Sequence, residues 1–183
     1  MKQNKSLLLM VIVLAVLAAL SRVAFYAQDF YFSPAIAMAL FCGAVIQNKQ
    51  IAFFVPIASM LLADVVFELS GIAPGFWGWG QLVGYGILAL ITVLGFYLKK
   101  INVLRVAGFS IVSSLLFFFL SNSSVWLLDS GVYYANNARG YMDCLVAGIP
   151  FLKNSLIADL LYSALFFAGY VWMEKYSFKK AIA

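Results

Sequence analysis

Residues 6–26 read SLLLMVIVLAVLAALSRVAFY, an apolar run with Ser21 and Arg22 near its end. About 20 apolar residues form an α-helix long enough to cross the ~30 Å hydrocarbon core of a bilayer. Lys2 and Lys5 precede the run, so a cleaved secretory signal is the alternative interpretation. However, the run exceeds the roughly 7–15 apolar residues of a signal peptide. We therefore expect a retained first membrane helix.

Five further apolar stretches follow, separated by short polar segments. Hydrophobic residues make up 65% of the 183 residues and charged residues 10%, and the mean hydropathy is +0.99. A soluble domain normally carries about 25% charged residues, so lipid is the expected solvent. The sequence predicts an all-α membrane protein with one domain, 1–183. Its six transmembrane helices are expected at about 6–26, 34–47, 51–69, 81–98, 105–128 and around 156–172.

The basic residues predict the orientation. Nine of the twelve fall on one side of the predicted helices and three on the other, and the basic-rich side is normally cytoplasmic. Both termini are therefore expected inside, with 27–33, 70–80 and 129–143 as outer loops. The nine inner residues are Lys2, Lys5, Lys49, Lys99, Lys100, Arg105, Lys175, Lys179 and Lys180; the outer three are Arg22, Arg139 and Lys153. Six acidic residues, including Asp29, Asp129 and Asp143, fall on the outer side.

Polar side chains concentrate in the outer halves of the predicted helices. An ionisable residue inside a membrane costs about 2.5–3.5 kcal/mol on insertion scales, and it usually faces a cavity or a partner. We therefore predict one shared polar cavity, open to the outside. The alternative is that the same residues pair with one another and only hold the helices together. The residues are Arg22, Asp64, Glu68, Gln81, Tyr85, Asn122, Asn154 and Asp159.

Three tryptophans are expected on the same side. Trp77 and Trp79 lie in the Gly-rich stretch GIAPGFWGWG (71–80), and Trp126 ends the fifth apolar run. An interfacial aromatic belt accounts for such residues in any membrane protein. The alternative is that all three belong to the substrate-binding site, with Trp77 and Trp79 in a lid that folds over a ligand.

Other motifs limit the chemistry. The chain has no His and two Cys, which excludes a Ser-His-Asp triad and a His-based metal site. No GxxxxGK[ST] phosphate loop is present. Ala15 and Ala19 form a small-xxx-small pair, which allows another helix to pack closely. Cys144 is either an unpaired small residue or, as a soft thiolate ligand, a metal ligand.

Several stretches resemble the S components of energy-coupling factor (ECF) vitamin transporters, and most closely a bacterial family of S-component-like transport proteins. The resemblance covers nearly the whole chain, which also has the length, the six helices and the Ala15–Ala19 pair of an S component. The stretches are Ser21-Arg22, 32–37 (FSPAIA), 56–64, 117–126 (FFFLSNSSVW) and 148–159.

The resemblance implies a multi-pass protein of the bacterial cytoplasmic (inner) membrane that binds its substrate at the outer side. In S components, the Ala pair contacts a membrane coupling subunit, and separate ATPases supply energy. Solitary cobalamin S components place a cysteine near the cobalt, a role that the resemblance implies for Cys144. Cobalamin would then be substrate, and no cofactor is expected.

The leading hypothesis is therefore a substrate-binding subunit, not an enzyme, for uptake of a vitamin-like small molecule. Its predicted pocket is roofed by Trp77, Trp79 and the 129–143 loop. The main alternative is a membrane enzyme or assembly factor acting on a lipid-borne substrate, with acid–base chemistry from Asp64, Glu68 or Asp159. A structural partner subunit is the third possibility.

Overall fold

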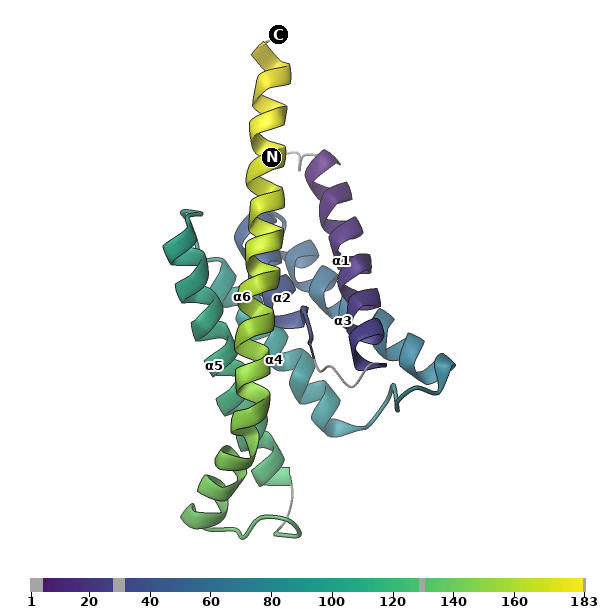
Figure 1. Cartoon of the computed structure of the whole chain (residues 1–183), viewed down its shortest axis with the longest axis vertical. Helices are drawn as coiled ribbons and strands as arrows, with labels where there is room; N and C mark the ends of the chain where they lie inside the picture. Colours follow the sequence, from purple (N-terminus) through teal and green to yellow (C-terminus); the bar gives the residue numbers. More distant parts are fainter. Residues whose placement is uncertain (1–4, 28–31, 129–130, 183) are drawn as a thin grey trace.

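The computed structural model describes residues 5–27, 32–128 and 131–182, and of Lys5 and 176–182 the backbone only. Within these ranges the chain forms six α-helices and no strand, which confirms the predicted all-α fold (Figure 1). Lys2, Asp29 and Asp129, which contributed to the predicted orientation, lie outside the described residues. The helices are α1 (Lys5–Tyr26), α2 (Ala35–Val45), α3 (Lys49–Ser70), α4 (Trp79–Gly95), α5 (Val103–Leu128) and α6 (Ala138–Ile182).

Four of these helices are long and apolar enough to cross a membrane: Ser6–Tyr26, Lys49–Ser70, Val103–Leu128 and Ala138–Lys175. Large apolar side chains on them are exposed, for example Leu9 at 64% and Phe54 at 70%. Such surfaces suit lipid, so the chain is a membrane protein. The two remaining helices, α2 and α4, are apolar but shorter.

The chain ends and the connections alternate between two ends of the bundle. The start of α1 and the end of α6 lie at one end, together with the α2–α3 and α4–α5 connections (Figure 1). The α3–α4 and α5–α6 connections lie at the other end. This arrangement fits termini on one side of the membrane, and which side that is stays a prediction from the basic residues.

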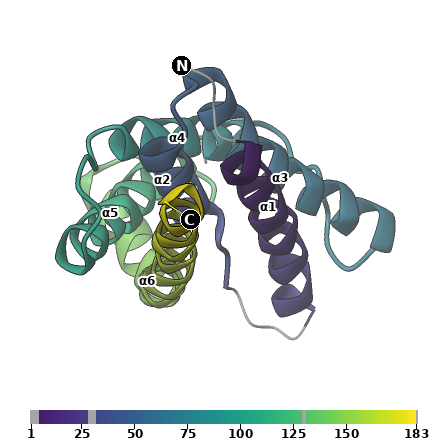
Figure 2. The same cartoon turned by 90° about the horizontal axis from the view of Figure 1, so that it is seen from above.

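Helix α2 is the centre of the bundle. It packs against each of the other five helices, and every residue from Ile36 to Gly43 is buried. Figure 2 shows it between α5 and α6 on one side and α1 and α3 on the other. With 11 residues, α2 is about 16 Å long, roughly half the hydrocarbon thickness. The sequence predicted a longer second helix, to Gln47, because Ile46 continues the apolar run.

Glycines let α2 and α4 approach each other closely. A Cβ added at Gly43 would lie 2.1 Å from the carbonyl oxygen of Thr92 and 3.0 Å from Cα of Gly95. In return, a Cβ at Gly95 would lie 2.5 Å from the carbonyl oxygen of Leu40. No real side chain tolerates such contacts with backbone, so this crossing requires glycine on both helices.

The Ala15–Ala19 pair lies inside the bundle. Ala15 and Ala19 are 8% and 2% exposed, and the carbonyl oxygen of Ala15 accepts a 2.7 Å hydrogen bond from Ser59 Oγ on α3. This corrects the assignment of the pair as a surface for a partner subunit. The close packing that small residues permit is used within the chain, between α1 and α3.

Helix α6 begins earlier than predicted. The outer loop was expected to continue to Asp143, but the helix starts at Ala138. Asn137 caps this start, because its Oδ1 accepts a 2.9 Å hydrogen bond from the Gly140 amide. With 45 residues, α6 is about 68 Å long and extends well beyond the hydrocarbon core.

Candidate functional site

A buried carboxylate on α3 joins three helices at one end of the bundle. Asp64 is 1% exposed, and its Oδ1 accepts a 2.7 Å hydrogen bond from Arg22 Nη1 on α1. The Arg22 side chain is 20% exposed, and its guanidinium also lies over the ring of Phe67, 5.2 Å from the centroid. A cation–π contact and an ion pair therefore hold the same guanidinium.

The second oxygen of Asp64 is held by α4. Its Oδ2 accepts hydrogen bonds from Gln81 Nε2 at 2.8 Å and from the Tyr85 hydroxyl at 2.5 Å. Gln81 and Tyr85 are one helical turn apart, so both face α3, and their side chains are 3.2 Å apart. Both oxygens of Asp64 thus have donors, which stabilises a buried charge.

The α3–α4 loop closes over this network. Gly75 is buried: its amide donates to Glu68 Oε2 at 3.0 Å, and its carbonyl oxygen accepts from Gln81 Nε2 at 2.9 Å. A Cβ at this position would lie 2.0 Å from the Asp64 carbonyl oxygen. Glycine is therefore required for the loop to reach α3.

The loop tryptophans do not point into this network. Trp77 and Trp79 are 56% and 77% exposed. The Trp77 indole lies against Gly80, and the Trp77 amide donates to Gln81 Oε1 at 3.4 Å. Backbone of the loop, at Gly75, covers the polar network, while the indoles stay on its outer surface.

Asp159 forms a second polar cluster. It is fully buried, and its Oδ2 accepts from Ser114 Oγ at 2.6 Å and from Ser155 Oγ at 3.0 Å. It also lies beside the backbone amide of Ala37 in the first turn of α2. Sequence analysis placed Asp159 near the outer end of its helix. It lies about 32 Å along α6 instead, because that helix begins 21 residues earlier, at Ala138.

A third cluster joins α5 to the first part of α6. Asn122 Nδ2 donates to the Phe118 carbonyl at 2.8 Å, and the Cys144 thiol donates to the Asn122 carbonyl at 3.5 Å. Gly148 packs against the Asn122 amide, where a Cβ would lie 2.6 Å from Oδ1. Cys144 is 2% exposed. The two helices would have to separate before this thiol could meet a cobalt centre, and the cobalt-binding role of Cys144 stays a prediction.

The remaining predicted residues lie on the same two helices. Trp126 Nε1 donates to the Ala135 carbonyl at 3.0 Å, and its ring packs edge-on against Tyr141 at 5.4 Å. This contact holds the α5–α6 connection. Asn154 is half-buried on α6. Most of the predicted residues therefore divide among three clusters, and they do not form one continuous group.

Serines that sequence analysis did not single out connect the helices. Ser110 and Ser163 share a 3.1 Å hydrogen bond between α5 and α6. Tyr162 donates to Ser21 Oγ at 3.0 Å and so joins α6 to α1 beside Arg22. Ser110 lies one turn from Ser114, and Ser163 one turn from Asp159. This four-residue spacing of polar groups in apolar helices was the signal that could have revealed the contact.

Comparison with curated proteins and with solved structures finds no match. A protein-family model, however, matches residues 2–181, which include the six helices except the last residue of α6, and the three clusters described above. The chain therefore belongs to DUF6580, a family of unknown function.

Proposed function

We propose that the chain is a substrate-binding membrane subunit for uptake of a vitamin-like small molecule, with the site at the joined ends of α1, α3 and α4. The observation that carries this proposal is the hydrogen-bonded network around Asp64. Arg22 on α1 and Gln81 on α4, which lie 42 and 17 positions from Asp64 in sequence, both bond to this one buried carboxylate. A glycine-dependent loop covers it. A network of this kind fixes the positions of polar groups at the edge of a site.

The residues of the network have different roles. Asp64 and Gln81 are buried and hydrogen-bonded, so we assign them to positioning. Arg22 and Tyr85 are half-buried and Glu68 is exposed, so these three can meet a ligand. The ligand would be a small polar molecule that accepts hydrogen bonds from Arg22 and donates to Glu68.

Binding accounts for this site better than catalysis. An acid–base residue must exchange a proton with its substrate. Both oxygens of the Asp64 carboxylate already accept hydrogen bonds from Arg22, Gln81 and Tyr85. A carboxylate held in this way suits electrostatic positioning, and the proposal therefore assigns no enzymatic activity.

Uptake would begin with capture from the outer side and movement of the 71–78 loop. The similarity to S components supports this sequence of events and implies a membrane coupling subunit and separate ATPases in a bacterial inner membrane. Because Ala15 and Ala19 are buried, a coupling subunit would contact other residues. The exposed face of α1, with Leu9 and Leu17, is the candidate.

Tryptophan fluorescence tests the proposal, because Trp77 lies in the loop that would move and Trp79 directly follows it. The purified protein is titrated with cobalamin and then with each water-soluble vitamin. We expect one compound to change the emission, and the change to be lost in the double variant Trp77→Phe, Trp79→Phe. The variant Trp172→Phe, altered far from the loop, should retain it. An emission change that survives the double variant would place binding elsewhere and contradict the proposal.

A further inference from the structure

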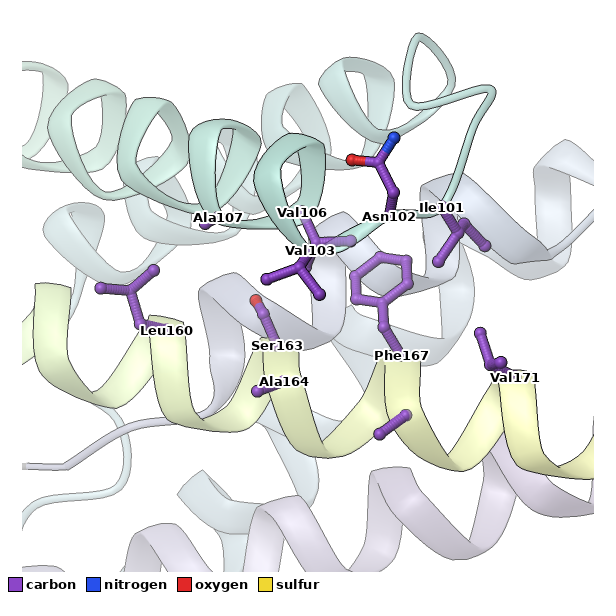
Figure 3. A pocket seen from close by; sticks show the side chains of 11 residues that line it. Ile101, Asn102, Val103, Val106, Ala107, Leu160, Ser163, Ala164, Phe167 and Val171 are labelled. Atoms are coloured by element: carbon purple, nitrogen blue, oxygen red, sulfur yellow. The ribbon is translucent and has the colours of Figure 1, made fainter.

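An apolar groove opens between α5 and α6, apart from the Asp64 network (Figure 3). Its volume is about 450 Å³. The start of α5 and the segment before it form one wall, and the middle of α6 forms the other. Its apolar walls include Ile101, Val103, Leu160, Ala164, Phe167 and Val171.

The groove offers a ligand almost no polar group. Asn102 and Ser163 are the polar residues that line it. Oδ1 of Asn102 accepts from the Arg105 amide at 2.9 Å, and Ser163 is bonded to Ser110 at 3.1 Å. Val103, which also lines the groove, is 88% exposed. The walls therefore suit a hydrocarbon ligand.

The size of the groove distinguishes between hydrocarbon ligands. A helix 10–12 Å in diameter fills roughly 400–600 Å³ per turn. The groove, at about 450 Å³, would therefore hold a single turn of a partner helix. A thin, flexible acyl chain, in contrast, can lie along its whole length, from Leu160 at one end to Ile101 and Val171 at the other (Figure 3).

Positive charge gathers at the second of these ends. Lys99 and Lys100 directly precede Ile101, and both are exposed. Lys175 is exposed as well, and it follows Val171 by four residues, so it lies on the same face of α6 one turn further on. Basic residues beside an apolar groove between membrane helices are suited to an anionic lipid headgroup.

We propose that this groove binds one anionic phospholipid. An acyl chain lies between α5 and α6, and the phosphate of the headgroup meets Lys99, Lys100 and Lys175. The apolar walls account for the chain, and the three lysines account for a preference for negatively charged lipid. This site is independent of the small-molecule site at Asp64.

Lipid retention tests the proposal. The full chain is purified in micelles that contain equal amounts of phosphatidylglycerol and phosphatidylcholine, and bound lipid is measured by native mass spectrometry. We expect one retained phosphatidylglycerol. The variant Lys99→Gln, Lys100→Gln should bind it about 25-fold less tightly, at roughly fivefold per lysine. The control Arg139→Gln, Lys153→Gln removes two exposed charges elsewhere on α6 and should retain it.

A second variant tests the groove itself. Ala164→Phe places a ring in the groove and should abolish retention, whereas Ala147→Phe, at an exposed position on the same helix, should not. Equal retention of the two lipids, retention unaffected by Ala164→Phe, or a second protein chain bound where the lipid is expected would each overturn the proposal.

Discussion

Arg22 on α1 donates a hydrogen bond to Asp64 on α3 across 42 positions of sequence, at 2.7 Å. Asp64 is 1% exposed. Removal of one partner of a buried ion pair leaves the other charge uncompensated, at a cost of about 3–5 kcal/mol. We therefore expect Arg22→Met to lower the thermal stability of the purified protein by a comparable free energy.

The double variant Arg22→Met, Asp64→Leu provides the control. It removes both charges and should be more stable than Arg22→Met alone, because no buried charge is then left unpaired. Equal losses of stability in the single and double variants would show that the interaction between Arg22 and Asp64 does not contribute to the stability of the protein.

The crossing of α2 and α4 gives a second prediction. Gly43→Ala places a methyl group against the Thr92 carbonyl and should destabilise the protein by about 1–3 kcal/mol. Gly86→Ala is the matched control, since a Cβ there meets nothing within 4 Å. Thermal unfolding of both variants measures the difference. Similar unfolding temperatures would mean that the helices are further apart than described.

A third prediction concerns the hydrogen bond between Ser114 and Asp159. Ser114→Ala removes a 2.6 Å donor from a buried carboxylate and should cost about 1–3 kcal/mol. Ser113→Ala, at the neighbouring buried position, removes only a hydrogen bond to the Phe109 backbone and should cost less. Chemical denaturation compares the two. A larger effect at Ser113 would contradict the assigned contact.

Cysteine labelling tests the orientation. Cys42 and Cys144 are buried and are replaced by alanine, and a single cysteine is then introduced at position 102 or 137. In intact cells an impermeant reagent should label Asn137→Cys and leave Asn102→Cys unlabelled until the cells are opened. The opposite labelling pattern would reverse the predicted topology.

Much of the fold could be predicted from the sequence, because hydrophobic run length and turn residues determine where membrane helices lie. The ends of α1, α3 and α5 agree with prediction within a few residues. The central position of α2 could not be predicted, because apolar residues suit lipid and protein interior equally well. The same ambiguity led to the wrong assignment of Ala15 and Ala19.

The candidate site was predicted less completely. The pairing of Arg22 with Asp64 was one of two predicted alternatives, and Gln81 and Tyr85 were predicted to lie in the same polar region. The position of each residue along its helix was predicted less accurately. Asp159 was predicted too close to the outer end of its helix. The helix begins much earlier than predicted, at Ala138, where Asn137 caps it. Depth alone also could not show that Asn122 and Asp64 belong to different clusters.

The proposal that the Asp64 network borders a small-molecule site has one direct test. The protein and its variants are purified from cells grown in rich medium, and copurified compounds are identified by untargeted mass spectrometry. Arg22→Gln alters the network, and Glu68→Gln removes the charge of an exposed residue assigned to the ligand. Arg105→Gln alters an exposed residue in the first turn of α5, whose start lies at the other end of the bundle. Thermal unfolding of each variant is measured in parallel.

The account predicts one small molecule that copurifies with the wild-type protein and with Arg105→Gln. It should be reduced about tenfold or more in Arg22→Gln, since a hydrogen bond to a charged group contributes about 1.5–3 kcal/mol. Glu68→Gln, which removes the charge of the exposed side chain assigned to the ligand, should lose most of the compound while its unfolding temperature stays close to that of the wild type. The network is structural and the proposed function is wrong if the wild type retains no compound. The same conclusion follows if, in both variants, the amount of retained compound falls only as far as the unfolding temperature does.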